Sequence, residues 1–296
     1  MNIGKIPAKQ AFLEPSKDAV FDVHEGRRIS YGELDERIKR LSNGFIHSLN
    51  LTKGDRVAIL AKNCIEYLEV IYACARSGLV AQPLNWRLSD EELTRILADG
   101  EPELLVVSGE YADTGARLQQ LGNVRCRLET GQTQENSYEA LINRSNDSEP
   151  DPLDQNGGDD PALILYTGGT TGQSKGALHT HHSLFMGMLN QTVAERIVPS
   201  DVYMLTGQMF HIPVALAMNY MAHGCPLVLI NFDAKLALEI IQRERVTAFL
   251  GVTTMLNWMM AVENFTEYDL SSLRNIQYGG GPMPHSVVTA ALEAFP

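Results

Sequence analysis

The chain has 296 residues, and its 24 Lys plus Arg against 36 Asp plus Glu give a formal net charge of −12. Hydrophobic residues make up 44% and charged residues 20%, which excludes a disordered, collagen-like or coiled-coil chain as the main state. The acidic balance repels a phosphate backbone and disfavours nucleic acid as a partner, although a single loop could still hold a phosphate.

Signals for export or membrane insertion are not found. The N-terminus lacks the apolar core of a signal peptide, and no segment approaches the roughly 18 consecutive apolar residues of a membrane span. The four cysteines are scattered without a Cys-x-x-Cys pair, which is typical of reduced thiols and argues against a metal site built from them. We therefore expect a cytoplasmic protein without a transmembrane segment.

Capping boxes indicate two helix starts early in the chain, at Ser30-x-x-Glu33 and Ser89-x-x-Glu92. Apolar residues at helical spacing follow the first box as far as Leu49. Short apolar runs between the helices are typical of buried strands. The elements predicted in this part are helices over 30–49, 65–76 and 89–98 and strands over 57–60 and 104–107.

An acidic segment over 146–160, with Pro150, Pro152 and Gly157-Gly158, predicts a solvated linker. Strands and helices alternate again after it, which favours an α/β fold with helices covering parallel sheets. The strands predicted there are 162–166, 177–180, 202–206, 226–230, 248–252 and 273–277. The helices predicted there are 183–194, 214–222, 234–244, 254–262 and 284–293.

One loop between two predicted strands carries the chemistry. The stretch 165–176 reads Leu-Tyr-Thr-Gly-Gly-Thr-Thr-Gly-Gln-Ser-Lys-Gly. Glycines let backbone N–H groups approach an anion, hydroxyls add donors, and Lys175 adds a positive charge, so the loop suits a polyphosphate. A Walker A loop is excluded because Gly172 precedes Gln173 and not Lys. A loop without a ligand is disfavoured by the entropy that ordering it would cost.

The same stretch resembles the signature Tyr-Thr-Ser-Gly-Thr-Thr-Gly-x-Pro-Lys-Gly of the AMP-forming acyl-CoA synthetases and their adenylate-forming relatives. Two positions depart from it, with Gly168 in place of Ser and Ser174 in place of Pro. The resemblance implies that this loop grips the β- and γ-phosphates of ATP. The implied phosphate-binding residues are Thr167, Gly168, Gly169, Thr170, Thr171, Gly172 and Lys175.

Two later motifs extend the resemblance, which runs from about Tyr31 to the end of the chain. Met-Phe-His-Ile at 209–212 resembles the motif whose histidine lines the carboxylate and acyl site, so His211 joins Lys175 as a catalytic candidate. A carboxylate needs no deprotonation at pH 7, so His211 would orient it or gate the acyl tunnel. Residues 278–283 resemble the family's Gly-Gly-Ala-Pro turn, which implies adenine and acyl contacts from Gly279, Gly280, Gly281 and Pro282.

The resemblance implies a fold of two αβ subdomains, 52–199 and 1–51 plus 200–296, with the nucleotide between them. It also implies an incomplete N-terminal adenylation domain, since the family's small C-terminal domain and its Tyr-Gly-x-Thr-Glu motif would follow Pro296. The main Mg²⁺ ligand is that Glu, so we expect no metal ligand within this chain and an inactive fragment. A homodimer is left open.

For the complete protein, the resemblance implies that a carboxylic acid reacts with ATP to give acyl-AMP, and then with CoA to give acyl-CoA. Gly281 and Thr253 suggest a roomy pocket, which favours a fatty or other sizeable acid. Two alternatives stay open. The chain could be a non-catalytic fragment that binds nucleotide or acid, or the acyl group could be loaded onto a carrier protein.

His179-x-His181 raises a separate hypothesis of a zinc site. On one strand the two imidazoles would point to the same face and could both bind Zn²⁺. No third ligand follows from the spacing, so the sequence favours no metal site here.

Overall fold

The computed structural model describes residues 1–296 except 133, 135–136, 151–155 and 168–173. Its strands form two six-stranded sheets, which we call sheet A, in the order β12-β11-β9-β10-β1-β2, and sheet B, in the order β6-β5-β3-β4-β7-β8. All neighbours pair in parallel except at one edge of each sheet, where β2 and β8 run antiparallel to β1 and β7. The α/β prediction is confirmed, with these two antiparallel edges added.

The bounds of the strands are as follows. Sheet A contains β1 (Asp18–Asp22), β2 (Arg27–Ser30), β9 (Tyr203–Leu205), β10 (Leu227–Leu229), β11 (Ala248–Leu250) and β12 (Asn275–Gln277). Sheet B contains β3 (Arg56–Leu60), β4 (Val80–Pro83), β5 (Leu104–Val107), β6 (Cys126–Glu129), β7 (Pro161–Thr167) and β8 (Lys175–Thr180).

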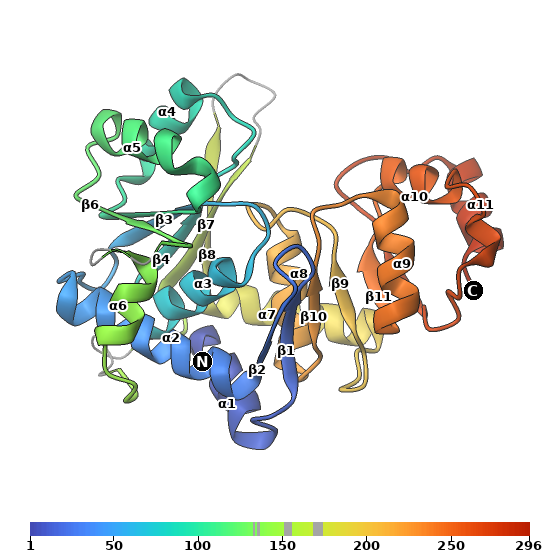
Figure 1. The fold of residues 1–296 in the computed structure, drawn as a ribbon, viewed down its shortest axis with the longest axis horizontal. Helices are drawn as coiled ribbons and strands as arrows, with labels where there is room; N and C mark the ends of the chain where they lie inside the picture. The colour runs from blue at the N-terminus through green and yellow to red at the C-terminus, as the bar shows by residue number, and fades with distance from the viewer. Residues whose placement is uncertain (133, 135–136, 151–155, 168–173) are drawn as a thin grey trace.

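Helices cover the faces of the two sheets, with α4 and α5 at one end of the molecule and α9, α10 and α11 at the other (Figure 1). The α-helices are α1 (Ile6–Leu13), α2 (Tyr31–Asn43), α3 (Ile65–Ser77), α4 (Asp90–Gly100), α5 (Ala112–Leu121), α6 (Tyr138–Arg144), α7 (His181–Glu195), α8 (Pro213–Ala222), α9 (Ala234–Glu244), α10 (Thr253–Met260) and α11 (His285–Ala294). Single turns lie at η1 (Ile3–Lys5), η3 (Gly109–Tyr111) and η4 (Phe265–Glu267), and α2 continues as a π-helical segment, η2 (Gly44–Ser48).

Alternation along the strands divides the core into three parts. In β3, Val57 and Ile59 face a large central core, whereas Ala58 and Leu60 face a smaller one shared with α4 and α5. In sheet A, Met204 faces a third core under α9 and α10. Period-two alternation of apolar residues on both faces is what a sheet covered on both sides requires. The layers are therefore helix, sheet B, helix, sheet A, helix.

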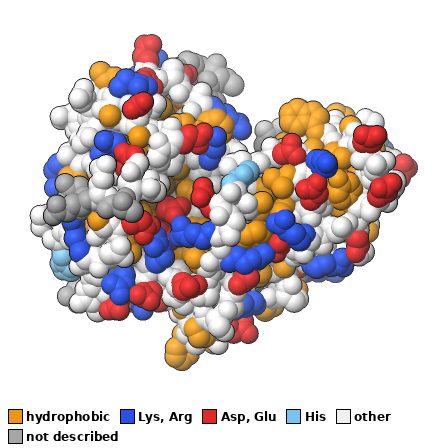
Figure 2. Space-filling model, in the orientation of Figure 1, with side chains coloured by type: hydrophobic (Ala, Val, Ile, Leu, Met, Phe, Trp, Pro, Cys, Tyr) orange, Lys and Arg blue, Asp and Glu red, His pale blue; other side chains and the backbone are white. Residues whose placement is uncertain are grey.

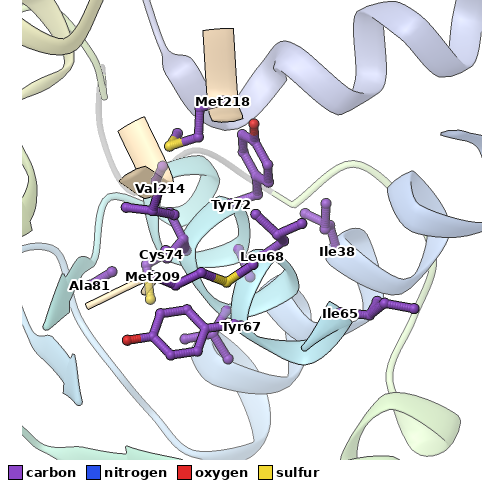
Figure 3. Close-up of a cluster of buried hydrophobic side chains, with 14 of the residues drawn as sticks. Ile38, Ile65, Tyr67, Leu68, Tyr72, Cys74, Ala81, Met209, Val214 and Met218 are labelled. Carbon is purple, nitrogen blue, oxygen red and sulfur yellow. The ribbon is translucent and has the colours of Figure 1, made fainter. Parts of the chain in front are cut away.

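The central core joins the two sheets through their shared middle helices. Figure 3 shows Tyr72 of α3 beside Met218 of α8, with Val214 of α8 near them, and Tyr67 of α3 on the opposite side of the cluster by Met209. All five side chains belong to one continuous cluster of buried residues. Because α3 follows a strand of sheet B and α8 follows a strand of sheet A, this packing fixes the two sheets relative to each other. The proposed division at residues 51–52 and 199–200 stays a prediction.

Most predicted elements are confirmed to within a few residues. Both capping boxes form, with the Ser30 and Ser89 hydroxyls accepting from the N–H groups of Glu33 and Glu92. Gly78 ends α3 with a left-handed φ of 80°. The elements for which the sequence offered no prediction are α1, α5, α6, β1, β2, β4 and β6. In the described part of the chain, no helix combines the length and the apolar character that a membrane crossing needs.

The expectation that His179 and His181 share one strand is wrong. Strand β8 ends at Thr180, whose hydroxyl caps α7, and His181 is the first residue of that helix. The His181 ring is fully buried, and its Nδ1 accepts from the Ile3 N–H at 3.1 Å, while Nε2 lies 3.2 Å from Asn156 Oδ1. Burial lowers the pKa of His181 to about 4. This histidine ties the N-terminus to α7, and the described residues contain no cluster of three metal-binding side chains.

Candidate functional site

A cleft of about 1,100 Å³ opens where strands of both sheets end (Figure 2 shows the surface hollowed between the two lobes). Residues that follow β9, β10, β11 and β12 of sheet A line it, together with the last residue of β7 and residues that follow β3 and β4 of sheet B. Its lining is Lys62, Trp86, Arg87, Thr167, Glu195, Gly207, Gln208, His211, Ile212, Pro213, Leu216, Asn231, Phe232, Leu250, Val252, Thr254, Met255, Trp258, Gln277, Tyr278, Gly279 and Gly280. Open α/β sheets place ligands at the carboxyl ends of their strands, so this cleft is the candidate site.

His211 stands on the short segment between β9 and α8, with its side chain exposed to the cleft. Its ring centre lies 4.6 Å from that of Phe210 in an edge-on contact. The backbone N–H of His211 donates to the backbone carbonyl of Gln208 at 3.1 Å. Partial burial of the imidazole, and next the positive charge of Arg87, lower the pKa of His211. The ring is therefore uncharged at pH 7, and it can offer a substrate one donor and one acceptor.

Replacing Arg87 by glutamine is expected to raise the pKa of His211 while leaving it below its ordinary value, because burial is the larger cause of the shift. An NMR titration of the His211 ring proton would measure both proteins. Lys235→Gln removes an exposed cation outside the cleft and serves as the control. A His211 pKa that stays constant or falls in Arg87→Gln would contradict this electrostatic coupling.

An aromatic and basic wall from sheet B faces His211. Trp86 Nε1 donates to Gln208 Oε1 at 3.0 Å, and the Trp86 ring lies edge-on to Phe210 at 6.4 Å. The Arg87 guanidinium lies 4.9 Å and the Lys62 ammonium 5.6 Å from the Trp86 ring centre. Lys62 is also ion-paired with Glu110, so Arg87 is the main positive group on this side of the cleft.

Asn63 joins the two sheets directly beside the cleft. It follows β3 of sheet B and is only 4% exposed. Its Nδ2 donates to the carbonyls of Gly207 at 2.8 Å and Ile230 at 3.1 Å, and its Oδ1 accepts from the Met209 N–H at 3.0 Å. One buried amide thus fixes the ends of β9 and β10, and with them the segment that carries His211.

The glycine turn after β12 supplies another side of the cleft. Gly279 and Gly280 line it, whereas Gly281 and Pro282 continue the turn outside the lining. Gly280 has a φ of 77°, and no heavy atom of the described residues lies within 4 Å of the Cβ position at Gly279, Gly280 or Gly281. Backbone groups at such positions are accessible to a ligand. The Pro282 carbonyl accepts from Thr253 Oγ1 at 3.0 Å, which ties the turn to α10.

The predicted phosphate loop is described only at its two ends. Thr167, the last residue of β7, lines the cleft. Lys175 opens β8 directly opposite Thr167, with an exposed side chain that is not part of the described lining. Gly168, Gly169, Thr170, Thr171 and Gly172 lie outside the described residues. The structure thus places one end of the loop at the cleft and the lysine beside that end.

Apolar side chains from sheet A and its helices form the remaining side of the cleft. Phe232 stacks on Trp258 with ring centres 6.4 Å apart. Leu216 of α8 and Leu250 of β11 extend this surface toward the middle helices. The cleft therefore has a polar, cationic side, suited to an anion, and an apolar side, suited to the body of an organic acid.

Two mostly parallel sheets with a cleft at their strand ends define an α/β protein whose candidate ligand site lies where strands of both sheets end. The sequence model of the AMP-binding enzyme family matches residues 8–296, and the chain belongs to this family. The family resemblance stated from the sequence motifs is thus confirmed.

Named relatives of this chain include ligases of different acids. It is 33% identical over 296 residues to a feruloyl-CoA synthase of Amycolatopsis sp., covering 98% of this chain and 57% of the relative. It is 30% identical over 287 residues to the long-chain-fatty-acid–CoA ligase FadD13 of Mycobacterium tuberculosis, covering 95% and 54%. The chain thus spans little more than half the length of these curated relatives.

Solved structures share the fold. An inhibitor-bound N-terminal domain of FACL13 from Mycobacterium tuberculosis superposes with a TM-score of 0.90 at 28% identity, covering 99% of this chain and 74% of that one. ATP-bound MatB from Rhodopseudomonas palustris gives a TM-score of 0.86 at 27% identity, covering 100% and 58%.

Proposed function

We propose that this chain is the ATP- and acid-binding part of a ligase that activates a carboxylic acid as its acyl adenylate and then passes the acyl group to CoA. The observation that carries the proposal is the convergence of Thr167, His211, Gly279 and Gly280 on one cleft. These residues come from three separate motifs, and a single ligand-sized cavity brings them together. Four unpaired cysteines agree with a cytoplasmic location.

In the proposed first step, a carboxylate oxygen of the acid attacks the α-phosphorus of ATP, and the bond from that phosphorus to the β-phosphate bridging oxygen breaks. Pyrophosphate leaves with the electron pair. Repulsion between two anions is the main obstacle, and Lys175 with the N–H groups of the loop would reduce it. The uncharged His211 would hold the acid carboxylate by a hydrogen bond, and the cleft would align the two reactants.

In the proposed second step, the sulfur of CoA attacks the acyl carbon and its thiol proton passes to solvent. The bond from that carbon to the phosphate oxygen breaks, and AMP leaves with the electron pair. The described residues contain no cluster of three metal-binding side chains, and the chain spans little more than half the length of its curated relatives. No step is assigned to Mg²⁺ here. We accordingly propose that residues 1–296 alone bind ATP and acid but do not complete the reaction.

The test begins with the reading frame beyond the codon for Pro296. The full product of that frame should exchange labelled pyrophosphate into ATP only when a carboxylic acid is present, whereas residues 1–296 alone should not. Exchange without acid, or no exchange by the full product with any acid of a broad panel, would contradict the proposal. Transfer to a carrier protein in place of CoA would show in a second assay with both thiols.

Changing Lys175 to alanine in the full product should lower kcat/KM for ATP by about 100-fold, since it removes a positive charge from the phosphate loop. Binding of the acid, measured by calorimetry on residues 1–296, should change less than about twofold. Lys235→Ala, on the exposed face of α9, is the matched control. Unchanged kinetics for ATP would discard the role of Lys175.

A further inference from the structure

One acidic side chain stands in the cleft that the mechanism above does not use. Glu195 is the last residue of α7, and it is the one Asp or Glu among the described residues that line the cleft. Its neighbour in the lining is Gln277, the last residue of β12, which donates a hydrogen bond from Nε2 to Glu195 Oε2. Together they make a polar end of the cleft, formed by the last residue of α7 and the last residue of β12.

A network of donors holds the Glu195 carboxylate in place. Tyr220 Oη donates to Glu195 Oε2 at 2.8 Å, and Gln191 Nε2 lies 3.3 Å from the same oxygen. Tyr203 Oη fixes Gln277 in turn by donating to its Oε1 at 3.0 Å. All three donors use Oε2, and none of the described residues donates to Oε1. The second oxygen is therefore a preorganised acceptor without a partner in a ligand-sized cavity.

Charge then orients any acid that enters. Lys62 and Arg87 lie together on the sheet B wall, whereas Glu195 comes from α7 on the side of sheet A. Lys62 is ion-paired with Glu110, so Arg87 is the cation that attracts a substrate carboxylate most strongly. Glu195 repels that carboxylate, so the far end of the acid points toward Glu195. An alkyl tail next to Glu195 would bury its Oε1 without a hydrogen bond, which is costly. A hydrogen-bond donor at the far end of the acid would instead bind this oxygen.

From this geometry we infer that Glu195 selects carboxylic acids that carry a hydrogen-bond donor, a hydroxyl or an ammonium group, at the end remote from the carboxylate. The inference rests on the proposed function and names the substrate class of its acid site. Among the fatty or other sizeable acids expected from the sequence, it favours those with a substituted far end, because a pocket ending in a carboxylate disfavours an unsubstituted tail. Gln277 is the positioning residue for Glu195.

Binding to residues 1–296 tests this without requiring turnover. The chain has two tryptophans, Trp86 and Trp258, and both line the cleft, so their fluorescence reports an acid that enters it. The probes are aliphatic acids over a ladder of chain lengths, each ending in a hydroxyl, an ammonium or a methyl group. At the best length, wild-type protein should bind the hydroxyl and ammonium acids at least about tenfold more tightly than the methyl acid.

Two substitutions separate charge from hydrogen bonding. Glu195→Gln should keep the preference for hydroxyl over methyl but lose about tenfold for the ammonium acid, because the amide can accept but is uncharged. Glu195→Leu should lose both preferences and bind the methyl acid most tightly. Glu139→Leu removes another partly buried, hydrogen-bonded carboxylate, one outside this cleft, and should leave all three affinities within about twofold.

The outcomes are distinguishable. Acid binding without a donor preference in wild-type protein, or a preference that survives Glu195→Leu in a protein with an unchanged melting temperature, overturns the role of Glu195 and leaves the proposed ligase standing. Failure of every acid to bind, with no acid-dependent pyrophosphate exchange by the full product, overturns both. A preference lost only in the Glu195 variants supports both.

Discussion

Replacing Asn63 by alanine is expected to lower the free energy of unfolding by about 3 kcal/mol and to weaken acid binding at least about tenfold. The variant leaves the Gly207 and Ile230 carbonyls and the Met209 N–H without the partner that each has in the wild-type protein. These groups belong to the ends of β9 and β10, so the segment carrying His211 loses its attachment to sheet B. Denaturant unfolding measures the first effect and calorimetry with the acid the second.

Asn43 provides a matched control for this result. It is also 4% exposed, its Nδ2 donates to the carbonyls of Asn146 and Ser148, each at 2.9 Å, and it is not part of the cleft lining. Asn43→Ala should therefore destabilise the protein by about 2 kcal/mol but leave the affinity for the acid unchanged. If both variants weakened binding equally, Asn63 would have a general structural role and no specific one at the site.

Local signals explain which parts of the fold could be predicted. Capping boxes, the left-handed Gly78 and continuous apolar runs act within a few residues, so they read directly from the sequence. Strand β1 carries an Asp at each end, and β4 ends in Pro83 and contains buried Gln82, which disguise short strands as loops. Tertiary burial makes them strands: β1 pairs with β10, and β4 lies between β3 and β7.

The candidate site likewise contains residues that the sequence predicted and residues that it did not. His211 and the glycine turn stand in motifs that are recognisable along the chain, and the cleft contains both. Trp86, Asn63 and Glu195 carry no such motif, since each has a partner more than 60 residues away in sequence: Gln208 for Trp86, Met209 for Asn63 and Gln277 for Glu195. The prediction that His181 lies on a strand with His179 failed for the opposite reason. The spacing of the two histidines imitates a strand pair, but the Thr180 cap starts a helix there.

The last prediction concerns Gly207, which links β9 to the segment carrying His211. A Cβ at this position would lie 2.4 Å from Cγ and 2.7 Å from Cβ of Pro213, and 3.3 Å from a methyl of Leu250. Pro213 is buried in the first turn of α8 and cannot move aside by changing rotamer. Gly207→Ala should therefore shift the start of α8, lower the free energy of unfolding by about 1–3 kcal/mol and weaken acid binding about tenfold.

Gly187 on α7 separates steric conflict from the general effect of a methyl group. Outside its own helix backbone, no heavy atom of the described residues lies within 4 Å of the Cβ that alanine would add at Gly187. Gly187 lies inside α7, and alanine is favoured over glycine in a helix by about 1 kcal/mol. Gly187→Ala should raise the melting temperature and leave acid binding unchanged, whereas Gly207→Ala should lower both stability and affinity. A Gly207→Ala protein that binds acid normally would mean that the position of His211 does not depend on the packing of Gly207 against Pro213. The candidate role of His211 would then have to be tested by substituting the histidine itself.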